Sequence, residues 1–119
     1  MKKTLIIGAT PNPSRYAYKA AHKLVQHGHA IINVGVKKGE VANHPIEKPV
    51  RVHDDIDTIT LYVNPTNQKD LYQYILDTKP KRIIFNPGTE NHELEELAKK
   101  QNIETLEACT LVLLATDQY

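Results

Sequence analysis

Short apolar runs alternate with stretches of helical periodicity along the whole chain. The apolar runs predict strands at residues 4–7, 30–34, 56–63, 82–85 and 103–106. Apolar side chains at helical spacing predict helices at residues 15–27, 66–77 and 91–100, and we expect the apolar segment 109–116 to form a closing helix. Residues 41–55 contain two prolines and little periodicity, so we expect them to be irregular.

This alternation predicts an α/β fold. Strand–helix–strand units give a parallel sheet with right-handed crossovers. We expect one domain over residues 1–119, a doubly wound and three-layered arrangement of about five strands in the order 3-2-1-4-5. Ligands of such sheets bind beyond the carboxyl ends of the strands, where the strand order reverses. The loop after the first strand lies at that point.

The first loop has the features of an anion site. Gly8 ends the strand where a side chain would block a close ligand or turn, and Pro11 and Pro13 fix the backbone that follows. Ser14 is a candidate N-cap for the next helix. Such a loop directs backbone N–H groups and a helix dipole at one point, and Arg15 adds a fork of donors. The pattern favours a diphosphate site.

This loop differs from the common nucleotide-binding fingerprints. It has Gly8 followed by Ala-Thr-Pro-Asn-Pro where a dinucleotide motif has three glycines, and no Gly-Lys-Ser/Thr follows as in a Walker A loop. Thr10, Asn12 and Ser14 supply short polar groups instead. The alternative interpretation is an ordinary strand-to-helix turn in which Asn12 and Ser14 act as caps.

Three further loops are expected at the same edge. After the second strand, Val36, Lys37 and Lys38 stand where an NAD site prefers an acidic residue. The two lysines suit a phosphate on the adenosine ribose, as in CoA or NADP. In the alternative interpretation they are a solvated surface pair. The third loop, residues 62–65, is a candidate to border an adenine: Tyr62, Val63, Asn64 and Pro65. In the alternative interpretation Val63 belongs to the core, and Asn64 and Pro65 end the strand.

The fourth loop, residues 86–91, lies next to the first in the expected sheet. Gly88 permits close approach of a ligand, whereas Asn86 and Asn91 are candidates either to contact it or to brace the loop. Helix capping by Thr89 or Asn91 is the alternative.

Composition excludes several classes of function. Fifteen basic and 14 acidic residues give a net charge of +1, which argues against a nucleic-acid or membrane-surface protein. No run approaches the ~20 apolar residues of a membrane span. The one cysteine, Cys109, allows no internal disulfide, is expected to be a buried inert thiol, and fits a cytoplasmic protein. No metal-ligand spacing and no nucleophile–base set is present, so we expect neither a metal nor a catalytic residue.

The chain resembles the stand-alone CoA-binding domain family, whose relatives include the nucleotide-binding part of the succinyl-CoA synthetase α subunit. The segment Gly8-Ala9-Thr10-Pro11-Asn12-Pro13-Ser14-Arg15-Tyr16 is similar to the family's Gly-Ala-Ser-x-Asn-Pro-x-Arg-Tyr loop, and residues 88–93 are similar to its Gly-x-x-Asn-x-Glu. Cys109 stands where many members carry a cysteine. The family's Pro-Val-Asn-Pro after the second strand is replaced here by Gly35-Val36-Lys37-Lys38.

The resemblance implies a Rossmann-like fold and a ligand. In the family the first loop holds the CoA diphosphate, which implies a role for Gly8, Ala9, Thr10, Asn12, Arg15 and Tyr16. We therefore expect a protein that binds CoA or an acyl-CoA, performs no chemistry alone, and acts as a homodimer or with an acyl-CoA-using partner enzyme. An NADP-linked oxidoreductase or redox sensor, and a regulatory partner subunit with a vestigial pocket, are the alternatives.

Overall fold

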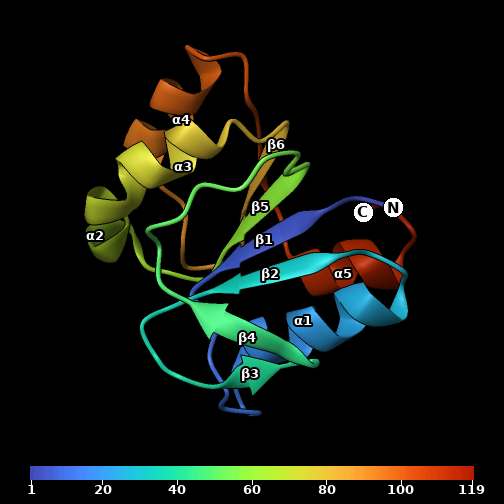
Figure 1. Ribbon diagram of the computed structural model, residues 1–119. Coiled ribbons are helices and arrows are strands. Elements are labelled where there is room, and N and C mark those ends of the chain that lie inside the picture. The colour runs from blue at the N-terminus through green and yellow to red at the C-terminus, as the bar shows by residue number, and fades with distance from the viewer.

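The computed structural model describes all residues, Met1–Tyr119, and is built on one seven-stranded sheet. The strand order is β3-β4-β2-β1-β5-β6-β7 (Figure 1). All neighbouring strands are parallel except β3, which pairs antiparallel with β4. The strands are β1 (Thr4–Ile7), β2 (Ile31–Val34), β3 (Glu40–Val41), β4 (His44–Glu47), β5 (Thr58–Leu61), β6 (Arg82–Phe85) and β7 (Glu104–Glu107).

Helices cover both faces of the sheet, which gives the three expected layers (Figure 1). One face carries α1 (Tyr16–Gln26) and α5 (Thr110–Ala115). The other carries α2 (Pro65–Gln68), the 3₁₀ turn η1 (Lys69–Leu71), α3 (Tyr72–Thr78) and α4 (His92–Lys99). Successive residues of β1 point to opposite faces, so Ile6 packs in the core beneath α1 while Leu5 and Ile7 belong to the core beneath α3 and α4.

The predicted number and order of strands were wrong, because segment 41–55 is not irregular throughout. It contains the second residue of β3 and all of β4, and the two strands are joined by a tight turn in which Ala42 and Asn43 have positive φ angles of 51° and 64°. β4 includes Pro45, and β3 has only two residues, so neither shows the alternation that marks a strand. The missed β4 pairs with β2, while the strand expected third, now β5, pairs with β1 on its other side.

The strand order still reverses at β1, as in the predicted topology. Counted alone, the six parallel strands lie in the chain order 3-2-1-4-5-6, with the antiparallel β3 added at the edge. The chain leaves β1 towards β2 and β4, and later returns to β5 on the opposite side of β1. The loop after β1 therefore lies at the topological switch point, as the sequence predicted.

Helix ends differ from the prediction at two places. Arg15 rather than Ser14 is the N-cap of α1, and it makes no side-chain capping bond. Asn64 caps α2 by accepting from the Asn67 N–H at 2.9 Å, so this helical region begins earlier than residue 66 and is divided into α2, η1 and α3. The closing helix is present as α5. None of the helices combines the length and apolarity needed to cross a membrane.

At the opposite edge of the sheet, His29 is held as a neutral acceptor. The Lys2 N–H donates to His29 Nδ1 at 2.9 Å. Burial lowers the pKa of His29 below 6.5, and the positive charges of the amino-terminal group, His27 and Lys2 lower it further.

We therefore expect the free energy of unfolding to fall as the pH drops below 6.5, because the unfolded chain then binds a proton that folded His29 resists. The contribution of His29 is fully present above 6.5 and is lost as the pH falls towards its lower folded-state pKa. In His29→Asn, whose side-chain oxygen replaces Nδ1 as acceptor, this part of the slope should disappear. Urea unfolding from about pH 5 to 7.5 measures both slopes; equal slopes would contradict the assignment.

Candidate functional site

Three loops meet backbone to backbone at the carboxyl edge of the sheet. Gly8 has a φ of +97°, and a Cβ there would lie 2.9 Å from the carbonyl carbon and oxygen of Tyr62. A Cβ on Gly35 would lie 2.4 Å from the carbonyl oxygen of Ala9. The loops after β1, β2 and β5 are thus packed so closely that two of the contact points require glycine.

Side chains within the first loop fix its shape. Asn12 Oδ1 accepts from both the N–H and the hydroxyl of Ser14, at 3.0 and 2.8 Å. The Asn12 N–H in turn donates to Thr10 Oγ1 at 3.3 Å, and the Arg15 N–H donates to the Asn12 carbonyl at 3.1 Å. Thr10, Asn12 and Ser14 therefore order the turn through local hydrogen bonds.

The same loop leaves a group of backbone donors without acceptors. The N–H groups of Thr10, Tyr16, Ala17 and Tyr18 make no hydrogen bond within the chain. Three of them are the first N–H groups of α1, where the helix dipole is positive, and the first turn contains no acidic residue. The exposed side chain of Arg15 forms no ion pair at this end of the helix. Unpaired donors, dipole and guanidinium together suit an anion with several oxygens.

The second loop lies against the first at two points. Besides the contact of Gly35 with Ala9, a Cβ on Gly39 would lie 3.2 Å from the side chain of Pro11. Residues 36–38 are held between these contacts: Val36 is 87% exposed, and Lys37 and Lys38 are exposed and form no ion pair. The structure thus brings two free cations beside the first loop.

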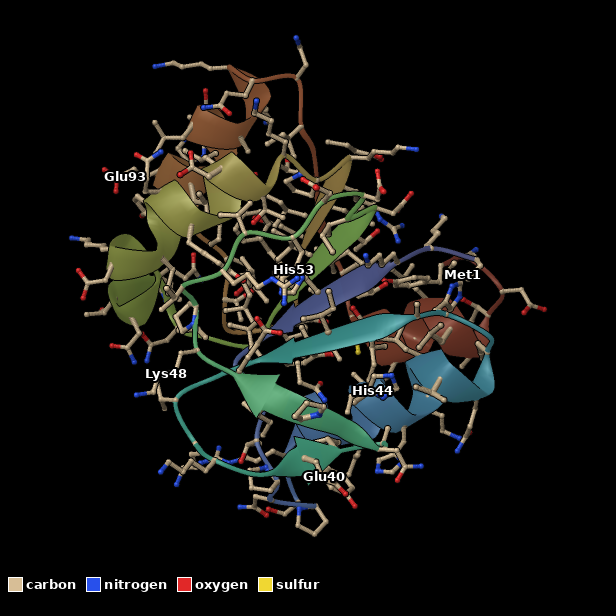
Figure 2. The ribbon with its side chains drawn as sticks, viewed as in Figure 1. Met1, Glu40, His44, Lys48, His53 and Glu93 are labelled. Atoms are coloured by element: carbon tan, nitrogen blue, oxygen red, sulfur yellow. The ribbon has the colours of Figure 1, made fainter.

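Lys48 is a cation at this edge that the sequence reasoning missed. The Glu47 carbonyl at the end of β4 accepts from the Gly35 N–H at 2.9 Å, so the exposed Lys48 follows directly beside the second loop (Figure 2). Lys48 could be placed here only by predicting β4, and the residues of that strand show no periodic hydrophobic pattern.

Residues 63–65 of the third loop each have a structural role in the fold. Val63 is half-buried against the core and its side chain contacts the Gly8 position. Asn64 caps α2, and Pro65 is the first residue of that helix, a position that needs no N–H. All three lie at the carboxyl edge, next to the first loop.

In the fourth loop, Gly88 and Asn91 lie in different surroundings. Gly88 is exposed with a φ of +92° and open space around it. Asn91 is buried, and its amide is fully used: it donates to Gln68 Oε1 at 2.9 Å and to the Tyr72 hydroxyl at 2.8 Å, and accepts from the Leu94 N–H at 3.2 Å. Asn91 therefore caps α4 and braces α2 and α3 from behind the edge.

Asn86 joins the ends of three elements. Its amide nitrogen donates to Thr60 Oγ1 at 2.7 Å and to the Leu61 carbonyl at 2.8 Å, and its oxygen accepts from the Thr110 N–H at 2.9 Å. This network ties β6 to β5 and to the start of α5. Cys109, the residue before α5, is partly exposed rather than buried as expected.

Tyr62, the first residue of the third loop and a candidate to border an adenine, is half-buried. Its hydroxyl is buried without a hydrogen-bond partner, and burial raises the pKa of Tyr62 to about 12. The phenol is therefore a neutral donor over the physiological range.

The switch-point loop and the parallel sheet define a Rossmann-like α/β protein. The family model described as the CoA binding domain matches residues 2–115, so the chain belongs to that family. No curated protein matches the chain.

Several solved structures share this fold. The crystal structure of an uncharacterized protein is 55% identical, with a TM-score of 0.98 over 100% of this chain and 98% of the other. A hypothetical protein from Pyrococcus horikoshii OT3 is 26% identical, with a TM-score of 0.84 over 93% of this chain and 80% of its own. A Thermus thermophilus protein described as cell-free ID.343 is 19% identical, with a TM-score of 0.87 over 99% and 90% of the two chains, and shows the fold alone.

Proposed function

We propose that this protein binds coenzyme A or an acyl-CoA, with the diphosphate held by the loop after β1. The observation that carries the proposal is the group of four unpaired N–H donors at the switch point, together with the free guanidinium of Arg15. Membership of the CoA binding domain family supports CoA as the source of that diphosphate. Gly8, Ala9 and Tyr16 complete the proposed loop contacts, and Thr10 and Asn12 maintain its shape.

The proposed contacts of the rest of the ligand follow from the neighbouring loops. Lys37 and Lys38, joined by Lys48, meet the phosphate on the adenosine ribose, and the exposed Val36 covers apolar ligand surface. Val63, Asn64 and Pro65 border the adenine, and Gly88 lines the far wall. Asn91 holds that wall in place through its buried network.

We propose that the protein performs no chemistry alone and presents the bound cofactor, in the cytoplasm, to an acyl-CoA-using partner enzyme. The lysines that replace an acidic residue after β2 also suit the 2′-phosphate of NADP, so an NADP-dependent function is the second candidate. The two ligands differ in the position of the ribose phosphate, and a direct comparison of their affinities separates them.

Calorimetric titration with CoA, dephospho-CoA, NADP, NAD and ADP should rank CoA first. Arg15→Ala should weaken CoA binding about tenfold or more, because it removes a charge-assisted contact with the diphosphate. Lys23→Ala removes one positive charge from the last turn of the same helix and should leave the affinity unchanged. Tighter binding of NADP than of CoA would favour the second candidate, and no CoA binding at millimolar concentration would reject the proposal.

A further inference from the structure

β7 is the outermost strand on one side of the sheet and pairs only with β6. The N–H groups of Glu104 and Ala108 donate to carbonyls at the two ends of β6, at 3.0 and 3.1 Å. Since backbone groups alternate in direction along a strand, the N–H and C=O groups of Thr105 and Glu107 point away from β6. No other segment hydrogen-bonds to them. β7 therefore presents two donors and two acceptors in a row at the edge of the sheet.

This edge lacks the features that commonly keep an edge strand from pairing with another chain. β7 pairs one-to-one with β6 over four residues, so it has no bulge, and it contains no proline. The opposite edge of the sheet is different (Figure 1): β3 has only two residues and ends in the turn where Ala42 has a φ of 51°. Of the two edges, only β7 offers a run long enough for a further strand.

The side chains at the edge of β7 are acidic. Glu104 and Glu107 are exposed, and neither forms an ion pair within the chain. A hydrogen bond from the Glu95 carboxyl group on α4, together with its like charge, raises the pKa of Glu107. Glu90 acts in the same direction, and His92 is the one basic group that opposes it. Carboxylates thus lie close together beside β7 without a cation to pair with them.

We propose that the edge of β7 receives an extended, basic segment of a partner protein, which pairs with it as a further strand. The backbone of that segment supplies partners for the outward N–H and C=O groups. Thr105 and Glu107 face the α4 side of the sheet, because their register neighbours on β6 belong to the core beneath α3 and α4. Alternate lysine or arginine side chains of the segment therefore meet the carboxylates of Glu107 and Glu95, while the residues between them lie beside the half-buried Leu106 on the other face.

A second copy of this chain fits the edge poorly. Antiparallel pairing of two β7 strands would bring the Glu95 and Glu107 carboxylates of both copies onto one face of the joined sheet, where like charges repel. The charge of the edge thus favours a basic partner over self-association. β7 and Glu95 are separate from the residues proposed to hold CoA, so this inference and the proposed function can fail independently.

Titration of ¹⁵N-labelled protein with a blocked heptapeptide, Thr-Lys-Val-Lys-Val-Lys-Thr, tests this edge by NMR. Its alternation places all three lysines on one face of a strand. The Thr105 and Glu107 backbone amides should shift saturably, with half-saturation below about 1 mM at low salt. The same peptide with glutamate in place of lysine should bind at least about tenfold more weakly, because it meets like charges. About 0.5 M sodium chloride should weaken binding of the lysine peptide severalfold.

Variants separate strand pairing from attraction between charges alone. Thr105→Pro removes one outward N–H and none that donates to β6, so it should weaken binding of the lysine peptide about tenfold while the sheet stays intact. Glu107→Gln should weaken binding about threefold or more. Its matched control is Glu40→Gln, which changes an exposed glutamate on β3 at the opposite edge and should leave the affinity unchanged.

Several results would overturn the proposal. These are no saturable shift of the Thr105 and Glu107 amides up to about 5 mM of the lysine peptide, equal affinity for the glutamate peptide, or wild-type affinity in Thr105→Pro. If Thr105→Pro does not fold, Glu107→Gln decides against Glu40→Gln, and equal affinities of these two variants reject the proposal. Shifts of the same amides with protein concentration alone would assign the edge to a second copy and likewise reject it.

Discussion

Gly35→Ala is expected to destabilise the protein by about 3 kcal/mol and to weaken CoA binding at least about tenfold. The added Cβ would lie 2.4 Å from the Ala9 carbonyl oxygen, a backbone atom that cannot rotate away. The first loop must therefore move, and the unpaired N–H donors lose their alignment. The φ of Gly35 is not in the left-handed region, so the effect comes from the close approach alone. Urea unfolding and calorimetry with CoA measure the two losses.

Gly28→Ala is the matched control. Gly28 ends α1 with a φ of +83°, and a Cβ there meets no atom within 4 Å. Alanine should cost about 1–2 kcal/mol of backbone strain but leave CoA affinity unchanged, since no loop at the carboxyl edge is displaced. If both variants weakened CoA binding equally, the packing of the second loop on the first would not matter for the ligand.

Asn86→Ala should lower the free energy of unfolding by about 3 kcal/mol, because three hydrogen bonds between buried groups are lost together. The substitution leaves the Leu61 carbonyl and the Thr110 N–H without their partners, and neither is open to water. The start of α5 is then released from β5 and β6. Chemical denaturation at constant pH measures the loss.

Asn67→Ala is the control for the loss of an asparagine. Its exposed side chain makes no hydrogen bond; only its backbone N–H donates, to Asn64. The change should alter stability by less than about 0.5 kcal/mol. A similarly small effect of Asn86→Ala would mean that the buried network does not hold the fourth loop and α5.

The sequence predicted those elements whose burial leaves a periodic trace. The parallel strands β1, β2, β5 and β6 and the helices α1 and α4 all bury one side or both, so their apolar spacing is visible, whereas β7 has only two half-buried residues in its middle. β3 and β4 have no such trace: they are held by backbone pairing and by Asn33, whose amide nitrogen donates to the Val41 and His44 carbonyls at 3.1 Å each. A strand fixed by a buried polar side chain cannot be found from hydropathy, and the wrong strand order followed from missing it.

The candidate site likewise has parts that the local sequence predicts and parts that depend on the tertiary fold. The turn after β1 was predicted because glycine, proline and short polar residues act locally in the sequence, and its hydrogen bonds among Thr10, Asn12 and Ser14 are local. The roles of Gly35, Lys48 and Asn91 depend on residues far away in the chain, since each is set by contact with Ala9, β2 or Gln68. Such pairings arise only from the tertiary fold.

A crystal structure of the protein with CoA tests the central claim most directly. Oxygens of the CoA diphosphate should lie within hydrogen-bond distance of the Thr10 and Tyr16 N–H groups, with the Arg15 guanidinium beside them. A diphosphate bound elsewhere, or a first loop whose four N–H donors remain unpaired with CoA present, would contradict the account.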